Sequence, residues 1–140
     1  MQDRGSYRLV ACFGVVASVV GLIGCGRSER PRLDIEGTVT YEGKPLPAGV
    51  IRFEPNPAKG NQGPVGIAAI VNGAYTTAAP GCRGAVPGPL VAVISGFPAA
   101  DSNIEYQAPL FAEWQAEVDL APAGRRPTRL DFAVPKQGHP

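Results

Sequence analysis

The chain has 140 residues, with 13 Lys and Arg against 12 Asp and Glu and a formal net charge of +1. This balance excludes the strongly basic footprint of a nucleic-acid-binding protein, so we expect no nucleic-acid partner. The length suits one small domain, whereas the 18 glycines and 15 prolines approach the composition of disordered chains, so hydrophobic periodicity must decide whether the chain folds.

The first 24 residues have the plan of an export signal. Arg4 and Arg8 precede an apolar run over residues 9–23 that contains no charged residue. Because a spanning helix needs about 20 apolar residues, the shorter run favours a removable signal peptide over a permanent transmembrane helix. Two alternatives stay open: a retained, uncleaved helix, or a removed signal that leaves Cys25 unmodified.

The apolar run ends in four residues that resemble a bacterial lipobox, namely Leu22, Ile23, Gly24 and Cys25. This resemblance implies thioether attachment of a diacylglyceryl group to Cys25 and cleavage before it. Two or more acyl chains would then hold the protein on a membrane, because each buried methylene contributes about 0.8 kcal/mol. Gly26 stands where Asp usually retains such proteins in the inner membrane. We therefore expect a lipid-anchored protein on the exported side of the cell membrane, in the outer membrane if there is one.

These features divide the chain into four parts. The short polar segment that follows the lipobox carries Pro31 and reads as a tether between lipid and domain. The predicted parts are a signal peptide over 1–24, a lipid-anchored tether over 25–32, a β-sandwich domain over 33–135 and a tail over 136–140.

The domain alternates apolar and polar residues with the period of two that is typical of half-buried strands. We expect Val39 and Phe53 to face inward on adjacent strands, joined by a turn over Glu42–Pro45. Asn72-Gly73 is a strong hairpin signal, and Tyr75 after it should point inward. The predicted strands cover residues 33–41, 48–54, 65–71, 74–78, 90–95, 112–120 and 129–134.

Some segments are less regular. Residues 110–120 fit both a helix and a strand, and we favour a strand from Ala112 to Leu120. Pro89 cannot donate to a ladder, so the strand that contains it should begin late or lie at an edge. The two long connections, residues 55–64 and 96–108, are expected to be irregular loops that carry any ligand contacts.

Seven short strands with turn chemistry between them predict an all-β, antiparallel sandwich. The stretches 37–46, 50–53, 72–75 and 87–93 resemble the carboxypeptidase regulatory-like domains, and more narrowly the small lipoproteins of this type in planctomycete bacteria. The resemblance covers about residues 35–134. It implies a prealbumin-like (transthyretin-like), seven-stranded Greek-key sandwich that is attached to a membrane and generally has no described activity.

Residues for catalysis or metal binding are few, so no catalytic residue, metal or cofactor is expected. His139 is the single histidine and lies in the predicted tail, which prevents a histidine-based triad or metal site in the core. Cys82 reads as an incidental loop thiol, with an intermolecular disulfide as the alternative. Two sets of carboxylates, Asp34/Glu36 and Glu113/Glu117/Asp119, each supply too few oxygens for a calcium site and read as solvated strand faces. The segment 101–103 reads as a turn.

Three functions follow for the domain, in order of preference. The first is a non-catalytic structural or interaction module at the cell envelope, with a membrane contact through lipid and an envelope protein or glycan as partner. The second is a carbohydrate-binding module with Phe97, Tyr106 and Trp114 as contacts. The third, a hydrolase like the urate-pathway enzyme of prealbumin fold, is disfavoured because that family needs internal histidines and a Tyr-Arg-Gly-Ser ending, whereas residues 137–140 read Gln-Gly-His-Pro.

Overall fold

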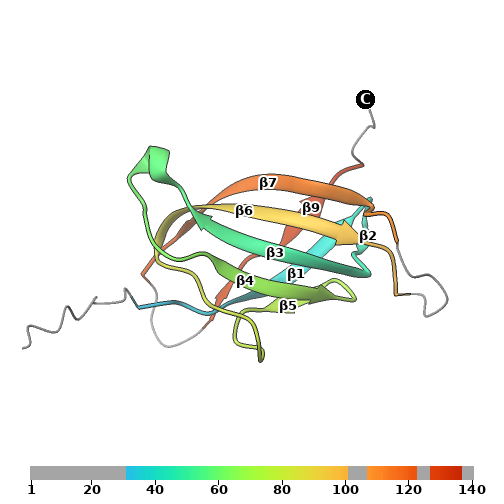
Figure 1. Cartoon of the computed structure of the whole chain (residues 1–140), viewed down its shortest axis with the longest axis horizontal. Coiled ribbons are helices and arrows are strands. Elements are labelled where there is room, and N and C mark those ends of the chain that lie inside the picture. Colours follow the sequence, from blue (N-terminus) through green and yellow to red (C-terminus); the bar gives the residue numbers. More distant parts are fainter. Residues whose placement is uncertain (1–30, 101–106, 123–126, 137–140) are drawn as a thin grey trace, which may run out of the picture.

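The computed structural model describes residues 31–100, 107–122 and 127–136, and this part of the chain is almost entirely β-structure (Figure 1). Its one helix is the single-turn 3₁₀ helix η1 (Pro57–Lys59). Within the described ranges no helix is long and apolar enough to cross a membrane. The strands are β1 (Ile35–Tyr41), β2 (Lys44–Pro45), β3 (Ala48–Pro55), β4 (Gly66–Val71), β5 (Ala74–Thr76), β6 (Gly88–Phe97), β7 (Phe111–Leu120), β8 (Thr128–Arg129) and β9 (Phe132–Val134).

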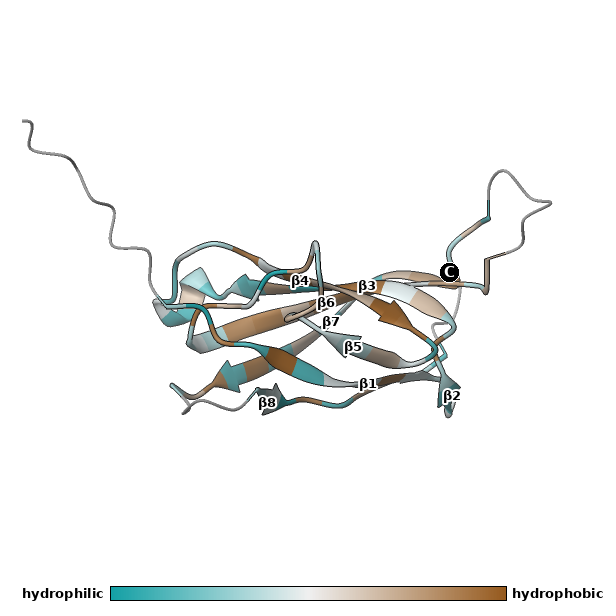
Figure 2. Cartoon of the chain, turned by 90° about the horizontal axis from the view of Figure 1, so that it is seen from below, coloured by the Kyte–Doolittle hydropathy of each residue, from teal (hydrophilic) through white to brown (hydrophobic). Residues whose placement is uncertain are grey.

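Seven of these strands form one continuous antiparallel path, in the order β2-β1-β5-β4-β3-β6-β7. The sheet curls along this path, so that β3, β4 and β6 form a layer that faces β1 and β8 (Figure 2). The all-β class and the antiparallel pairing along this path confirm the sequence prediction, and the curled sheet is consistent with the predicted sandwich. The curl arises because strands twist and each has one apolar face to bury, and folding the sheet over brings these faces together.

The last strand departs from the prediction of one continuous antiparallel strand over residues 129–134. It is broken into β8 and β9, and both pair with β1 in parallel. The break lies at Leu130 and Asp131, where the Leu130 carbonyl passes so close to Gly37 that a Cβ there would lie 1.8 Å from the oxygen. Leu130 N donates to Glu36 O at 2.9 Å. Only a glycine in β1 admits this approach.

The expectation that the first two long strands form a hairpin is wrong. β1 pairs with β2, β5, β8 and β9, whereas β3 pairs with β4 and β6. The connection between β1 and β3 crosses from one layer to the other through Leu46, which is fully buried, donates its N–H to Val39 O at 3.0 Å and accepts from Gly73 N at 2.7 Å. Only Glu42 and Gly43 form the turn, both at positive φ, so that Pro45 pairs with Thr40.

β6 is longer than predicted and begins neither late nor at an edge. It starts at Gly88 and pairs with β3 on one side and β7 on the other. Pro89 is tolerated in this central strand because β3 ends at Pro55, so the missing N–H falls where no further strand residue needs it. The Pro89 carbonyl remains bonded, since it accepts from Asn56 N at 3.0 Å.

The core contains the side chains that period-two alternation predicts. Phe53 is fully buried at its centre, with its ring 6.0 Å from that of Tyr75 and 6.5 Å from that of Phe132. β7 confirms the strand interpretation of residues 112–120, and it starts one residue earlier, at a buried Phe111. Leu130 is only half-buried because it lies in the break between β8 and β9. The fully buried large side chains are Phe53, Ile35, Leu46, Ile51, Ile70, Leu90, Ile94, Leu120, Val39, Val86 and Val134.

The connection over residues 55–64 is not irregular. Asn56 caps η1 by accepting a hydrogen bond from Ala58 N at 3.1 Å, and Gly60 ends the helix at φ 77°. Asn61 is 5% exposed, and its Nδ2 donates to Pro89 O at 2.9 Å. Two buried asparagines therefore fasten this loop to the end of β6.

Candidate functional site

An interruption of β5 accompanies a hollow on the domain surface. Tyr75 pairs with Ile70, and further along the same course Arg83 pairs with Ile67. Between these two pairings β4 runs only from Ile67 to Ile70, whereas the facing chain runs from Tyr75 to Arg83. The extra residues of the facing chain, 77–82, form a loop over the outer face of the sheet. Thr77 holds the start of this loop, because its N–H donates to Ile35 O and its Oγ1 accepts from Ile35 N, both at 2.8 Å.

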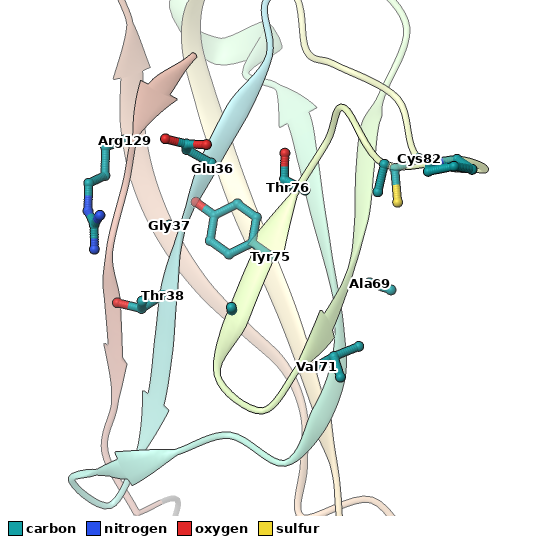
Figure 3. A pocket seen from close by; sticks show the side chains of 12 residues that line it. Glu36, Gly37, Thr38, Ala69, Val71, Tyr75, Thr76, Cys82 and Arg129 are labelled. Carbon is teal, nitrogen blue, oxygen red and sulfur yellow. The ribbon is translucent and has the colours of Figure 1, made fainter.

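The loop overhangs an open groove of about 620 Å³ (Figure 3). Its floor is the outer face of β1, β5 and β4, where the side chains are small and mostly apolar, and β8 borders it on the far side. The groove residues are Glu36, Gly37, Thr38, Ala69, Val71, Ala74, Tyr75, Thr76, Ala79, Pro80, Cys82 and Arg129.

Polar side chains of β1 and β8 at the rim of this groove form hydrogen bonds with Asp131. Thr38 donates from its N–H and its Oγ1 to Asp131 Oδ1, at 2.8 and 2.9 Å, and Arg129 Nε donates to Asp131 Oδ2 at 3.2 Å. The Thr38 hydroxyl, with further contributions from Arg129 and the Thr38 N–H, lowers the pKa of Asp131 below its ordinary value. Because these groups already bond one another, contacts with a ligand would come mainly from the apolar floor and from Glu36, an exposed residue of the groove.

Tyr75 is turned away from the groove toward the core. Its hydroxyl donates to Leu130 O at 2.7 Å, so the buried oxygen has a partner. Burial, reinforced by the negative charge of Asp131, raises the pKa of this phenol far above its ordinary value. Tyr75 is therefore neutral at physiological pH, and it ties β5 to the break between β8 and β9.

Cys82 lies on the overhanging loop, half-buried and with a free thiol. It borders both the groove and a second hollow of about 250 Å³ on the other side of the loop, over Val50 and Ile67. Sequence reasoning placed Cys82 in a loop, which is confirmed. It did not predict the groove, because no local pattern signals that a loop folds back over a sheet face.

The other predicted site residues are scattered. The lipobox from Leu22 to Cys25, Tyr106 and His139 lie outside the described residues. Trp114 pairs in register with the inward Ile94. Phe97 lies three residues after Ile94 and so on the opposite face of β6. Phe97 and Trp114 therefore do not share one aromatic surface, and Trp114 packs edge-on against Phe132 with centroids 6.4 Å apart.

The carboxylates of β7 project from the outer face of the sheet, as alternation predicts. Glu117 Oε2 accepts from Lys59 Nζ at 2.7 Å, and this hydrogen bond lowers the pKa of Glu117. Glu113 accepts from Arg52 at 3.4 Å, and Arg52 also donates to Glu54 at 3.0 Å. Across residues 31–100, 107–122 and 127–136, no three His, Cys, Asp or Glu side chains converge as a metal site would require.

Comparisons of the chain with protein-family models, with curated proteins and with solved structures found no match.

Proposed function

We propose that this protein is a lipid-anchored component of the bacterial cell envelope whose β-sandwich is a non-catalytic structural or interaction module. The observation that carries the proposal is the placement of the lipobox. Leu22 to Cys25 closes an uncharged apolar run, and the first strand of a folded domain begins soon afterwards, at Ile35. A cleaved and acylated Cys25 would leave the whole domain attached to the membrane by a short tether.

The geometry of the domain suits such an attachment. The described chain starts at Pro31, at the same end of the molecule as η1, whereas β2 and the turn between β4 and β5 lie at the opposite end (Figure 1). A tether that leaves from Pro31 would hold the first end toward the lipid. The groove and the flanks of the sheet would then face the aqueous side.

We further propose that the fold is a prealbumin-like Greek-key sandwich of the carboxypeptidase regulatory-like type. Support comes from the sequence stretches that resemble this family and from the crossing of the chain between layers. β1 lies in one layer and β3 in the other, joined by the short connection through Leu46. These two long strands, neighbours in sequence apart from the two-residue β2, thus lie in opposite layers, as in Greek-key sandwiches.

An interaction role is supported by apolar residues on the outer sheet face. Val71 is 61% exposed and Phe97 is 37% exposed, and both pair in register with Ala48 between them. The three side chains therefore form a row across β4, β3 and β6. Exposed apolar rows of this kind are typical of surfaces that contact other molecules.

Lipid attachment is tested by labelling expressing cells with an alkyne fatty acid. Wild type and Cys82→Ser should be labelled, whereas Cys25→Ser should not, since only Cys25 stands in the lipobox. Cys82→Ser is the matched control because it removes the one free thiol in the described part of the chain. Equal labelling of Cys25→Ser and wild type would contradict the anchor.

Localisation is tested by membrane fractionation of the same strains. Gly26, in place of Asp, leads us to expect the outer-membrane fraction in a cell with two membranes. The Gly26→Asp variant should shift toward the inner membrane. Recovery of wild type only with the inner membrane would contradict this assignment.

A further inference from the structure

β7 is a long strand at the end of the sheet, and it pairs only with β6 among the described residues. Its first part is irregular, because Glu113 adopts φ 53° and the register with β6 shifts between Ile94 and Gly96. From Gln115 to Leu120 the strand is regular. A regular sheet edge exposes a row of backbone groups that can pair with another extended chain.

The hydrogen-bond pattern shows which residues face the outer edge. In β6, the Pro89 carbonyl points toward β3, where it bonds Asn56 N, and the Gly96 carbonyl points toward β7, where it bonds Leu110 N. The backbone N–H and C=O groups of successive strand residues point to alternate edges of the strand, so those of the even-numbered residues of β6 bond β7. Their partners are Trp114, Ala116 and Val118. The N–H and C=O groups of Gln115, Glu117 and Asp119 consequently point outward from the sheet.

The inner face of β7 is incompletely covered. Trp114, Ala116 and Val118 pack against the core but remain half-buried, whereas their register partners Leu90, Ala92 and Ile94 in β6 are fully buried. From the facing layer, the Phe132 ring of β9 packs edge-on against Trp114. One further strand beside β7 would cover the strip, because its inward side chains would fill the same layer as these three.

The outer face of the edge is acidic. Asp119 has no ion-pair partner in the described part of the chain. Glu113 pairs with Arg52 of β3, and Glu117 pairs with Lys59 of η1. Two copies of β7 paired antiparallel would set these carboxylates against one another, which disfavours a second copy of this chain as the added strand. A strand with Lys or Arg on its outward positions would be favoured instead.

We propose that the outer edge of β7, from Gln115 to Leu120, binds an extended segment of a partner protein as an additional strand, with basic residues alternating with apolar ones. The basic side chains lie beside Glu117 and Asp119, and the apolar side chains cover Trp114, Ala116 and Val118. This proposal deepens the interaction role proposed above and rests on it, but it does not require lipid attachment. The two are separable, because edge binding is measured on purified protein and acylation in cells.

The test titrates the full chain, purified in detergent, with an acetylated and amidated (Lys-Val)₄ peptide. Trp114 is the only tryptophan of the chain and lies on the strip to be covered, so its emission should shift to shorter wavelength and saturate. A (Glu-Val)₄ peptide has the same backbone and the same apolar side chains. It should bind at least about tenfold more weakly, because its carboxylates meet those of β7.

Two variants identify the edge. Gln115→Pro removes an outward N–H without touching the ladder to β6, and should weaken (Lys-Val)₄ binding by about tenfold or more, as expected for a lost backbone hydrogen bond and a steric block. Gln115→Ala, the matched control, should bind like wild type. If Gln115→Pro does not fold, amide exchange on wild type replaces it, and the amides of Gln115, Glu117 and Asp119 should be selectively protected by the peptide.

Three outcomes would overturn the proposal. One is no saturable change in Trp114 emission with (Lys-Val)₄. Another is equal binding of both peptides, or equal binding by a folded Gln115→Pro. The last is a concentration-dependent dimer in sedimentation that Gln115→Pro abolishes, which would assign the edge to a second copy of this chain.

Discussion

The carboxylate of Asp131 takes the place of a backbone acceptor for Thr38: the Thr38 N–H and hydroxyl both donate to Asp131 Oδ1, at 2.8 and 2.9 Å. The contact lies where the parallel pairing of β1 with β8 and β9 is interrupted. A side chain thus satisfies the β1 donor that the ladder leaves open at this point. Without it the donor would lack a protein partner at the centre of β1.

The first prediction concerns the pH dependence of this contact. The pKa of Asp131 is lower in the folded protein than its ordinary value of 3.8. The carboxylate therefore stabilises the fold fully above 3.8, and this contribution is lost as the pH falls through the lower folded pKa. Asp131→Asn should melt below wild type at neutral pH, and the gap should narrow in acid.

The measurement is the melting temperature of both proteins from pH 7 down to pH 2. Asp34→Asn is the control, since Asp34 is also an exposed acid beside β1. It should follow the wild-type curve. A constant gap between Asp131→Asn and wild type across this range would show that the charge of Asp131 is not what stabilises the contact.

The second prediction compares two phenylalanines. Phe53 is fully buried between Tyr75 and Phe132, so Phe53→Ala should lower the free energy of unfolding by about 3–5 kcal/mol. Phe97→Ala makes the same chemical change at a side chain that is 37% exposed, and should cost less than about 1.5 kcal/mol. Urea unfolding measures both. Similar losses would contradict the assignment of faces to β3 and β6.

The third prediction separates steric from conformational effects of glycine. Gly37→Ala places a methyl group against the Leu130 carbonyl and should force β8 and β9 away from β1, costing more than about 3 kcal/mol. Gly43→Ala meets no neighbour within 4 Å but retains φ 78°, so it should cost about 1–2 kcal/mol. Thermal unfolding ranks the two variants. The reverse order would mean that the break at Leu130 moves freely.

The fourth prediction concerns the loop over residues 55–64. Asn61→Ala removes a buried amide that bonds Pro89 O, and should cost about 1–3 kcal/mol. Lys59→Ala removes only the exposed ion pair with Glu117, and should cost less than about 1 kcal/mol. Chemical unfolding distinguishes them. If shortening the whole loop left stability unchanged, the buried asparagines would have no structural role.

Alternation along single strands was sufficient to predict most of the elements. Ile35, Val39, Phe53 and Tyr75 are inward because a strand places every second side chain on one face, a property that two or three neighbouring residues already reveal. The Asn72-Gly73 turn was predicted for the same reason, since its backbone preference is local. The export signal, lipobox and anchor at Cys25 also rest on local sequence, and they stay predictions because they lie outside the described residues.

Pairing between distant segments was beyond the reach of the sequence. Three features depend on contacts between residues far apart in the chain. They are the choice of strands beside β1, the parallel course of β8 and β9, and the loop at Cys82 that overhangs the groove. Gly37 illustrates the limit. In the sequence it is one glycine in a strand, and only the approach of the Leu130 carbonyl shows why no side chain fits there. A strand's own residues determine which face is apolar, but its neighbours are selected by the packing of the whole sandwich.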